Sequence, residues 1–277
     1  MKRLLFLALL SLSLAACKSE FEKIRTSGDV DQIYDKALAY YEAEEYDKAQ
    51  ALFELIISRY RGKREAEEIY FKYAYTYYHL EQYILAAYYF KNFSNTYGTS
   101  ELREEADFMS AYANYQLSPT FRLDQQYTYE AIEGFQLFVN TYPNSERVEQ
   151  CNNLIDAMRA KLELKAFKAA ELYFNLQDYQ AAIQSFENVL KDFPDTNSRV
   201  EIEYMAIRSA YLLAKNSFVE KQKERYTATV KRASEFLARY RDSRYGDEVQ
   251  SMYEQSTDQL KELENVGYQD KSAGARS

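Results

Sequence analysis

The chain has 277 residues, with 28 Tyr and 16 Phe but no Trp, only 7 Gly and 3 Pro, and 35 basic against 43 acidic side chains for a net charge of −8. An all-β fold builds its frequent turns from Gly and Pro, and a nucleotide-binding loop needs clustered glycines, so this composition argues against both. The scarcity of Gly and Pro therefore predicts an all-α protein. The excess of acidic side chains argues against a nucleic-acid partner.

The N-terminus has the features of an export signal. Lys2 and Arg3 precede a largely apolar run over residues 4–14, and Leu14, two alanines and Cys17 follow. The run is shorter than the roughly 20 residues that span a bilayer. The L-A-A-C ending resembles the bacterial lipobox, which implies removal of residues 1–16 and lipidation of Cys17. An ordinary signal peptide that ends near a cysteine is the alternative. Lys18, in place of the Asp that retains lipoproteins at the inner membrane, favours the outer membrane.

Five copies of one helical pattern follow a predicted lipidated linker at residues 17–28. Each copy places a small or hydroxyl residue, a Phe and further apolar residues at spacings of three and four, which puts them on one helical face. The paired small residue and Phe are Ala49 and Phe53, Ala86 and Phe90, Ala131 and Phe135, and Ala182 and Phe186. The fifth copy is degraded: Thr229 takes the small position, and Ala233 and Phe236 follow it. The first four copies end at Gly62, Gly98, Pro143 and Pro194, residues that stop helices.

A partner helix precedes each of the first four copies and carries a small residue of its own, at Ala37, Ala74, Ala111 and Ala170. This helix-turn-helix pattern resembles the tetratricopeptide repeat. The resemblance implies a solenoid of about five repeats over residues 29–265, in which residues 246–265 form a C-terminal capping helix. Residues 270–277 are small and polar, and we predict a disordered tail over residues 266–277.

The spacing of the copies is irregular. Residues 117–130 form an insertion between the two helices of the third repeat, and residues 215–225 form one in the fifth. Residues 145–176 contain neither Gly nor Pro, which predicts one long helix or two stacked helices.

The helix predicted at residues 69–80 is unusually rich in Tyr. One interpretation is that these rings are core, because an inner solenoid helix packs on both flanks. The other is that the surplus rings stack on an extended peptide in a groove, offering apolar area and a hydroxyl. On the second interpretation the candidate peptide-binding residues are Tyr40, Tyr41, Tyr70 and Tyr77.

The sequence offers no catalytic constellation. The one histidine, His79, has no partnered acid or nucleophile, and Cys151 has no second cysteine or histidine near it for a metal site. We therefore expect a protein that is not an enzyme and that needs no cofactor or metal.

Charge is unevenly distributed. Residues 199–244 carry eleven Lys and Arg against six acids, so this end is a candidate docking surface for an acidic partner or anionic lipid head groups. Arg199, Arg208 and Arg232 are the candidate partner-binding residues. Alternatively, these side chains only balance neighbouring acids.

One stretch goes beyond generic repeats. It runs from Y-P-N-S at residues 142–145 through a long helix to A-A-E-L-Y-F at 169–174, Y-Q-A-A at 179–182 and D-F-P-D-T at 192–196. This order resembles the BamD family, lipoproteins of the outer-membrane β-barrel assembly machine. The resemblance implies a position on the periplasmic face of the outer membrane. Arg199 matches a family arginine implicated in docking, whereas the insertion at 215–225 departs from the family.

The resemblance also implies a function. We expect a non-enzymatic scaffold whose C-terminal repeats bind the POTRA region of a BamA-like β-barrel insertase. Its N-terminal repeats would help to recruit unfolded outer-membrane protein substrates. The alternative is a repeat-containing outer-membrane lipoprotein that serves pilus assembly, peptidoglycan remodelling or glycan binding.

Overall fold

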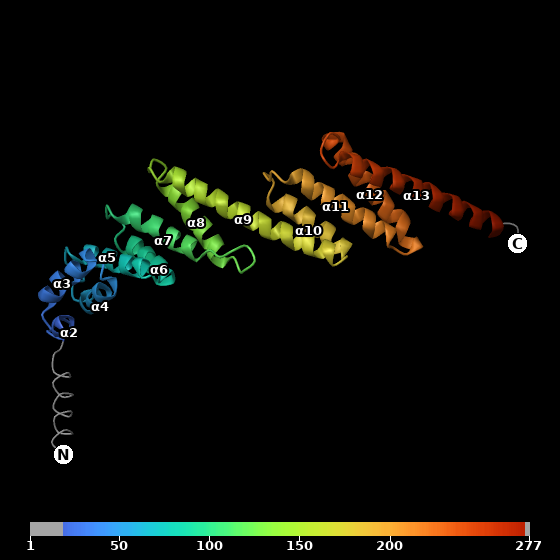
Figure 1. The fold of residues 1–277 in the computed structure, drawn as a ribbon. Coiled ribbons are helices and arrows are strands. Elements are labelled where there is room, and N and C mark those ends of the chain that lie inside the picture. The colour runs from blue at the N-terminus through green and yellow to red at the C-terminus, as the bar shows by residue number, and fades with distance from the viewer. Residues whose placement is uncertain (1–18, 275–277) are drawn as a thin grey trace, which may run out of the picture. The chain divides into compact units, whose positions relative to one another are not determined.

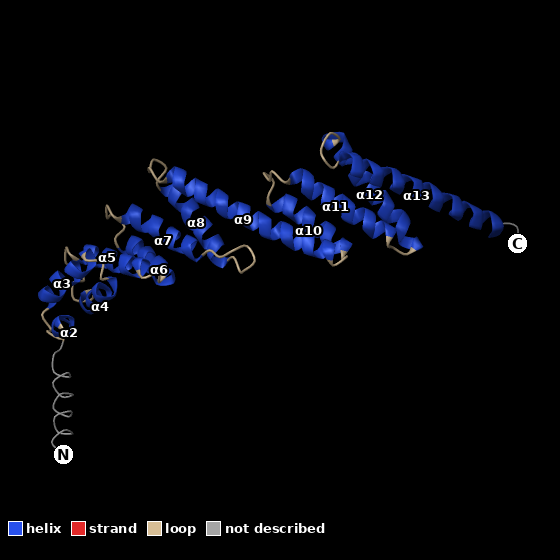
Figure 2. Ribbon diagram, viewed as in Figure 1, coloured by secondary structure: helices blue, strands red, loops and turns tan. Residues whose placement is uncertain are grey.

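The computed structural model describes residues 19–274, with side chains to residue 265, and every regular element in this range is a helix (Figure 1 and Figure 2). Cys17 and the predicted signal peptide lie outside the described residues. The helices are α2 (Glu20–Arg25), α3 (Val30–Glu42), α4 (Tyr46–Ile56), α5 (Ala66–His79), α6 (Tyr83–Thr96), α7 (Arg103–Leu117), α8 (Gln126–Thr141), α9 (Val148–Asn175), α10 (Tyr179–Asp192), α11 (Arg199–Lys215), α12 (Val219–Tyr240) and α13 (Gly246–Gly274).

From α3 onward the helices form five antiparallel pairs, α3–α4 to α11–α12, and α13 follows the last pair. The predicted fold class, an all-α tetratricopeptide-repeat solenoid, is confirmed. Short α2, capped by the Ser19 hydroxyl, lies within the predicted linker. Helix α13 begins at Gly246 and continues to Gly274, into the range for which the sequence predicts a disordered tail.

The repeat residues build the core. All five alanines and all five phenylalanines of the pattern are at most 1% exposed. Burying one Phe side chain contributes about 1.5–3 kcal/mol, and the neighbouring Ala lets the adjacent helix approach. The chain divides into two compact units, one up to Met158 and one from Arg159, and the boundary falls inside α9. Unit 1 has one continuous core, and unit 2 contains two smaller apolar clusters.

The irregular segments take different structures. Residues 118–125 form a loop between α7 and α8, and the buried amide of Gln125 fixes it by donating to the carbonyls of Thr120 and Leu123, both at 2.9 Å. Residues 145–176 contain the single long helix α9. The insertion at 215–225 is mostly helical, because α12 already begins at Val219, so it lengthens α12 by about two turns.

Buried and half-buried tyrosines make the fold sensitive to alkaline pH. Burial is the largest cause that raises their pKa, and at Tyr60 and Tyr142 hydrogen bonds to Asp31 (3.0 Å) and Asp107 (2.8 Å) add to it. The pKa is raised from 10.0 to about 12 at Tyr41, Tyr60, Tyr70, Tyr142 and Tyr204.

Because the hydroxyls ionise near pH 10 in the unfolded chain, the unfolded state releases its protons first as pH rises. We expect the free energy of unfolding to keep this contribution below about pH 10 and to lose it between about pH 10 and 12. Urea titrations across this range, with tyrosinate absorbance as a second signal, measure the effect. A free energy of unfolding that stays constant to pH 12 would contradict it.

Candidate functional site

The tyrosines of α5 are mostly structural. Tyr77 is 9% exposed and Tyr73 3%, and their hydroxyls lie 2.7 Å apart. The Tyr77 ring stacks on Tyr89 of α6, with centroids 4.8 Å apart and planes at 15°. Burial raises the pKa of both hydroxyls, so they are neutral hydrogen-bonding groups at physiological pH. Tyr77 therefore lies in the core, where it cannot stack on a peptide without a rearrangement of α5 and α6.

The other three candidate tyrosines are half-buried and pack against the core of unit 1. Tyr70 packs edge-on against Tyr89 and Tyr97, each with centroids 6.1 Å away. Tyr41 carries the Lys72 ammonium over its ring at 4.4 Å, and Tyr40 carries Lys48 at 5.1 Å. The structure thus does not gather Tyr40, Tyr41, Tyr70 and Tyr77 into one open surface.

The third repeat, α7–α8, lacks three of the aromatic rings that the second repeat, α5–α6, packs together. Ala74 of α5 and Ala111 of α7 occupy the same repeat position, as do Ala86 of α6 and Ala131 of α8. Counting from these alanines, the positions of Tyr73, Tyr77 and Tyr89 correspond to Ser110, Asn114 and Gly134. Three large rings are therefore replaced by a hydroxyl, an amide and a hydrogen atom.

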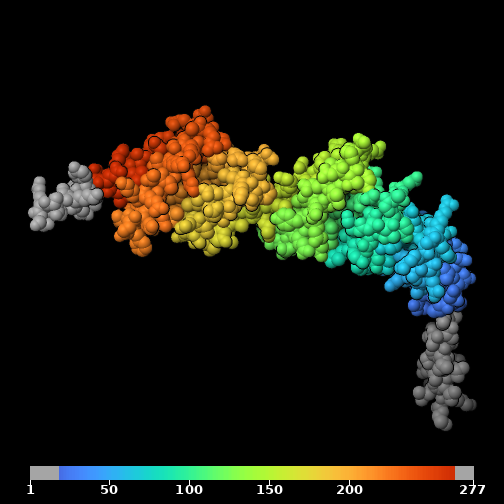
Figure 3. All heavy atoms as spheres, turned by 180° about the vertical axis from the view of Figure 1, so that it is seen from behind, coloured from blue at the N-terminus to red at the C-terminus, as the bar shows by residue number. Residues whose placement is uncertain are grey.

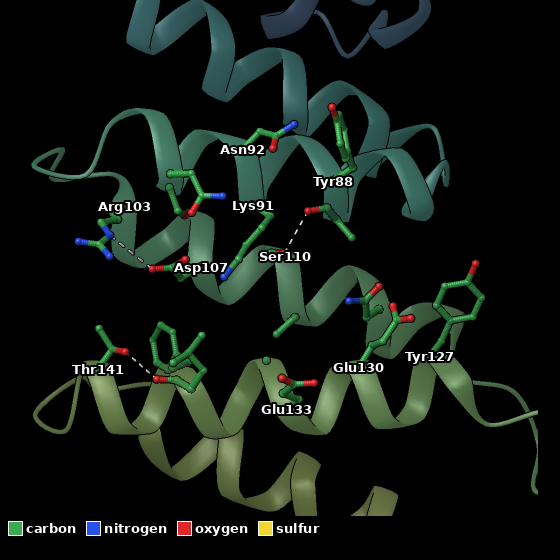
Figure 4. A pocket seen from close by; sticks show the side chains of 18 of the residues that line it. Tyr88, Lys91, Asn92, Arg103, Asp107, Ser110, Tyr127, Glu130, Glu133 and Thr141 are labelled. Carbon is green, nitrogen blue, oxygen red and sulfur yellow. Dashed lines mark hydrogen bonds and ion pairs between the residues drawn. The ribbon is translucent and has the colours of Figure 1, made fainter.

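A groove of about 530 Å³ opens where these rings are missing, with α7 as its floor and α6 and α8 as its sides (Figure 4). Gly134 is required there, because a Cβ at this position would lie 2.8 Å from the Cβ of Ala111. The floor is polar, and Ser110 is fixed by donating to the Ala87 carbonyl at 3.0 Å. The groove is lined on the floor by Arg103, Asp107, Ser110, Ala111 and Asn114.

The sides of the groove combine apolar and polar groups. Ile84 and Tyr88 of α6 are each 58% exposed, and Leu137 of α8 is 53% exposed, so three large apolar side chains border the groove in contact with water. Asn92 of α6 and Glu130 of α8 add polar atoms to the lining of the groove. Apolar sides over a polar floor suit an extended peptide, because its backbone needs hydrogen bonds while its side chains offer apolar area.

The candidate arginines of unit 2 take different positions. Arg199 donates to the Pro194 carbonyl at 2.7 Å and lies 3.6 Å from Glu203. Arg208 lies over the Phe174 ring at 5.1 Å. Arg232 pairs with Glu187 at 2.6 Å on the wall of a second groove, between α10 and α12. All three are engaged within unit 2, each with different residues.

A cluster of arginines lies where α12 ends. The sequence patterns did not single these residues out. Arg239, 55% exposed, approaches Glu203 at 3.9 Å and so shares this carboxylate with Arg199. Arg244, 71% exposed, lies 3.2 Å from Glu201, and Arg241 between them donates to Gln250 at 3.2 Å. We call Arg239, Arg241 and Arg244 the arginine cluster. The density of arginine in residues 239–244 is the sequence signal that would have found it.

Catalytic chemistry has little support in the described part of the chain. His79 is exposed but lies flat on Tyr46, with ring centroids 4.1 Å apart, and burial on that side lowers its pKa. Burial raises the pKa of the Cys151 thiol to about 11, which disfavours the reactive thiolate. Among residues 19–265, no group of three or more His, Cys, Asp or Glu is arranged to hold a metal ion. No helix in the described range is long and apolar enough to cross a membrane.

Two solved tetratricopeptide-repeat structures are among those similar to this chain. The tetratricopeptide-repeat domain of P58(IPK) is similar at 15% identity over 90% of this chain and 72% of that one, with a TM-score of 0.40. The TPR2AB domain of yeast Sti1, solved as a complex with pHSP90, is similar at 12% identity over 82% of this chain and 98% of that one, with a TM-score of 0.39. No curated protein matches the sequence.

A family model described as YfiO, outer membrane lipoprotein, matches residues 26–212, well over half of the chain. This confirms the resemblance to the BamD family, which rests on the repeats and the motifs at residues 142–196 within the matched range. The chain belongs to the YfiO, or BamD, family of outer membrane lipoproteins.

Proposed function

We propose that this protein is a non-enzymatic scaffold of the outer-membrane β-barrel assembly complex, anchored through lipid on Cys17 at the periplasmic face of the membrane. The observation that carries the proposal is the membership of residues 26–212 in the YfiO family, on a fold made of stacked helix pairs. Stacked repeats present extended surfaces and bind other chains with them. The scaffold would hold a BamA-like insertase by its POTRA region and help to recruit unfolded barrel substrates.

The groove between α6 and α8 supports substrate recruitment. Strands of outer-membrane barrels alternate apolar and polar side chains with a period of two residues. An extended segment of this kind can place its apolar side chains against Ile84, Tyr88 and Leu137 and direct backbone and polar groups to Ser110 and Asn114. We propose this groove as the peptide-binding site, in place of the candidate residues Tyr40, Tyr41, Tyr70 and Tyr77.

The arginine cluster supports docking of the insertase. The Arg244–Glu201 ion pair is a surface pair that adds little stability. The Glu203 carboxylate is only 14% exposed, but Arg239 at 3.9 Å from it is itself 55% exposed. Both arginines are therefore open to a partner. An acidic face on the partner would compete for them and steer association. Arg199 takes part indirectly, because it shares Glu203 with Arg239.

The docking prediction is tested by charge reversal. We expect the double variant Arg239→Glu and Arg244→Glu to weaken capture of a soluble POTRA fragment about tenfold or more, because like charges then face each other in the interface. Surface plasmon resonance at two salt concentrations measures the loss. The matched control is Lys221→Glu with Lys223→Glu, the same charge change at the other end of α12. Equal affinity of the arginine variant and wild type would refute docking at this cluster.

A further inference from the structure

The turn between α11 and α12 exposes an apolar pair. Phe218 is 86% exposed and Val219 is 65% exposed, and no other large apolar side chain among residues 19–265 is as exposed as Phe218. Covering an exposed Phe side chain with apolar groups lowers the free energy. The fold leaves this energy unused at Phe218, and the pair is not part of the groove or the arginine cluster.

Hydrogen bonds fix the turn that carries this pair. The Ser217 hydroxyl donates to the Leu213 carbonyl and accepts from Arg225, while the Gln222 amide donates to the Ser217 carbonyl at 3.1 Å. The Phe218 carbonyl accepts from the backbone of Lys221 at 2.9 Å. These hydrogen bonds hold the backbone at both ends of the turn, so Phe218 is exposed in a well-defined conformation.

A second apolar turn lies at the same edge of unit 2. Leu176, in the turn between α9 and α10, is 67% exposed, and Leu172 before it is 56% exposed. Asp178 and Lys221, which follow the two turns, line one groove, so the starts of α10 and α12 face each other. Figure 1 and Figure 3 show both turns at one edge, where the α11–α12 turn projects. We call Leu172, Leu176, Phe218 and Val219 the apolar edge.

Basic side chains outnumber acidic ones in the turn between α11 and α12 and the residues beside it. Residues 215–225 carry four basic side chains, Lys215, Lys221, Lys223 and Arg225, against Glu220 and Glu224. The side chains of Lys221 and Lys223 are both 63% exposed, and their ion pairs, with Glu224 at 3.9 Å and Glu264 at 3.3 Å, are open to water. Such pairs add little stability, so both ammonium groups are available to anionic groups.

We infer that the apolar edge is a membrane-contact site, which seats Phe218 and Val219 among the acyl chains at the surface of a bilayer while the lysines contact anionic phospholipid head groups. Aromatic and apolar side chains beside lysines favour the boundary between head groups and acyl chains. A projecting tip of two turns fits a bilayer better than a protein interface, which covers about 800 Å² per partner. The chain belongs to a family of outer membrane lipoproteins, so we expect a bilayer surface close to the protein. This contact is separate from the proposed docking and substrate sites.

The absence of Trp from the chain provides a specific test. Phe218→Trp, in a chain that starts at position 17 with Cys17→Ser to prevent lipidation, introduces a single tryptophan, which is excited selectively at wavelengths that the 28 tyrosines do not absorb. We expect its emission to shift to shorter wavelength on vesicles of phosphatidylglycerol and phosphatidylethanolamine, and brominated acyl chains to quench it. Leu123→Trp, at a position that is 60% exposed in unit 1, is the control and should not respond. An unshifted and unquenched signal from Phe218→Trp would overturn the proposal.

Two further variants separate lipid from protein. Phe218→Ser should lower vesicle binding about tenfold, since a tenfold change corresponds to about 1.4 kcal/mol and a Phe side chain contributes at least that much. Lys221→Glu with Lys223→Glu should abolish the preference for anionic vesicles over phosphatidylcholine. Arg239→Glu with Arg244→Glu should leave vesicle binding unchanged even if docking of the insertase fails. If Phe218→Ser instead weakens capture of the POTRA fragment and leaves vesicle binding as in wild type, the edge is a protein interface.

Discussion

Replacing Asn114 with Tyr should close the groove between α6 and α8 and lower its affinity for an extended barrel-strand peptide about tenfold or more, the equivalent of at least about 1.4 kcal/mol. The reason is the repeat correspondence: a Tyr at position 114 takes the place that Tyr77 has one repeat earlier, where its ring stacks on Tyr89 at 4.8 Å. In the third repeat Gly134 stands where Tyr89 would be, so the new ring has space to lie in the groove.

The measurement is fluorescence anisotropy with a labelled synthetic peptide of about ten residues that alternates apolar and polar side chains as a barrel strand does. The matched control is Asn153→Tyr, the same substitution on an exposed position of α9. Circular dichroism establishes that both variants keep their helices. If Asn114→Tyr and Asn153→Tyr bind the peptide equally well, the groove is not the peptide site.

Tyr77→Ala should destabilise the fold by about 3–5 kcal/mol, the range for truncating a large buried aromatic side chain, and leave peptide affinity unchanged. The variant loses the stacking contact with Tyr89 and leaves the Tyr73 hydroxyl without its partner at 2.7 Å in a buried position. Urea unfolding followed by circular dichroism measures the change, and anisotropy below the unfolding transition measures the peptide.

Tyr77→Phe is the control, because it keeps the ring and removes only the hydroxyl that contacts Tyr73, at a cost of about 0.5–1.5 kcal/mol per hydrogen bond. The pair of variants decides between the two interpretations of the tyrosine-rich helix. A loss of peptide affinity with normal stability in Tyr77→Ala would place the peptide over α5 and return Tyr77 to the binding surface.

The architecture could be predicted from local sequence patterns because each repeat encodes its own contacts. Ala74 and Phe90 lie on opposing helices of one pair, and their spacing within the pattern fixes the buried face of each helix. Gly246 likewise marks where the last helix begins. The structure of the insertion at residues 215–225 was harder to predict, because polar residues with helical propensity are compatible with either a loop or a lengthened helix.

The residues of the candidate site could not be predicted in the same way from local sequence patterns. An aromatic residue at a helical spacing can point into the core or toward a ligand, and the sequence of α5 does not distinguish the two for Tyr77. Nor does a count of basic residues tell that Arg232 is paired with Glu187 while Arg244 is largely exposed. These outcomes depend on which helices meet and on the side chains that each brings to the contact.

By itself, the sequence determined that the chain is a helical repeat protein with a lipoprotein-like N-terminus, because repeat residues at spacings of three and four specify a buried helical face wherever they occur. It also carried the family resemblance. Only the tertiary structure decided where the surface is open. Burial at one position depends on residues far away in the chain: Tyr89 covers Tyr77, whereas Gly134 leaves Asn114 uncovered and so opens a groove.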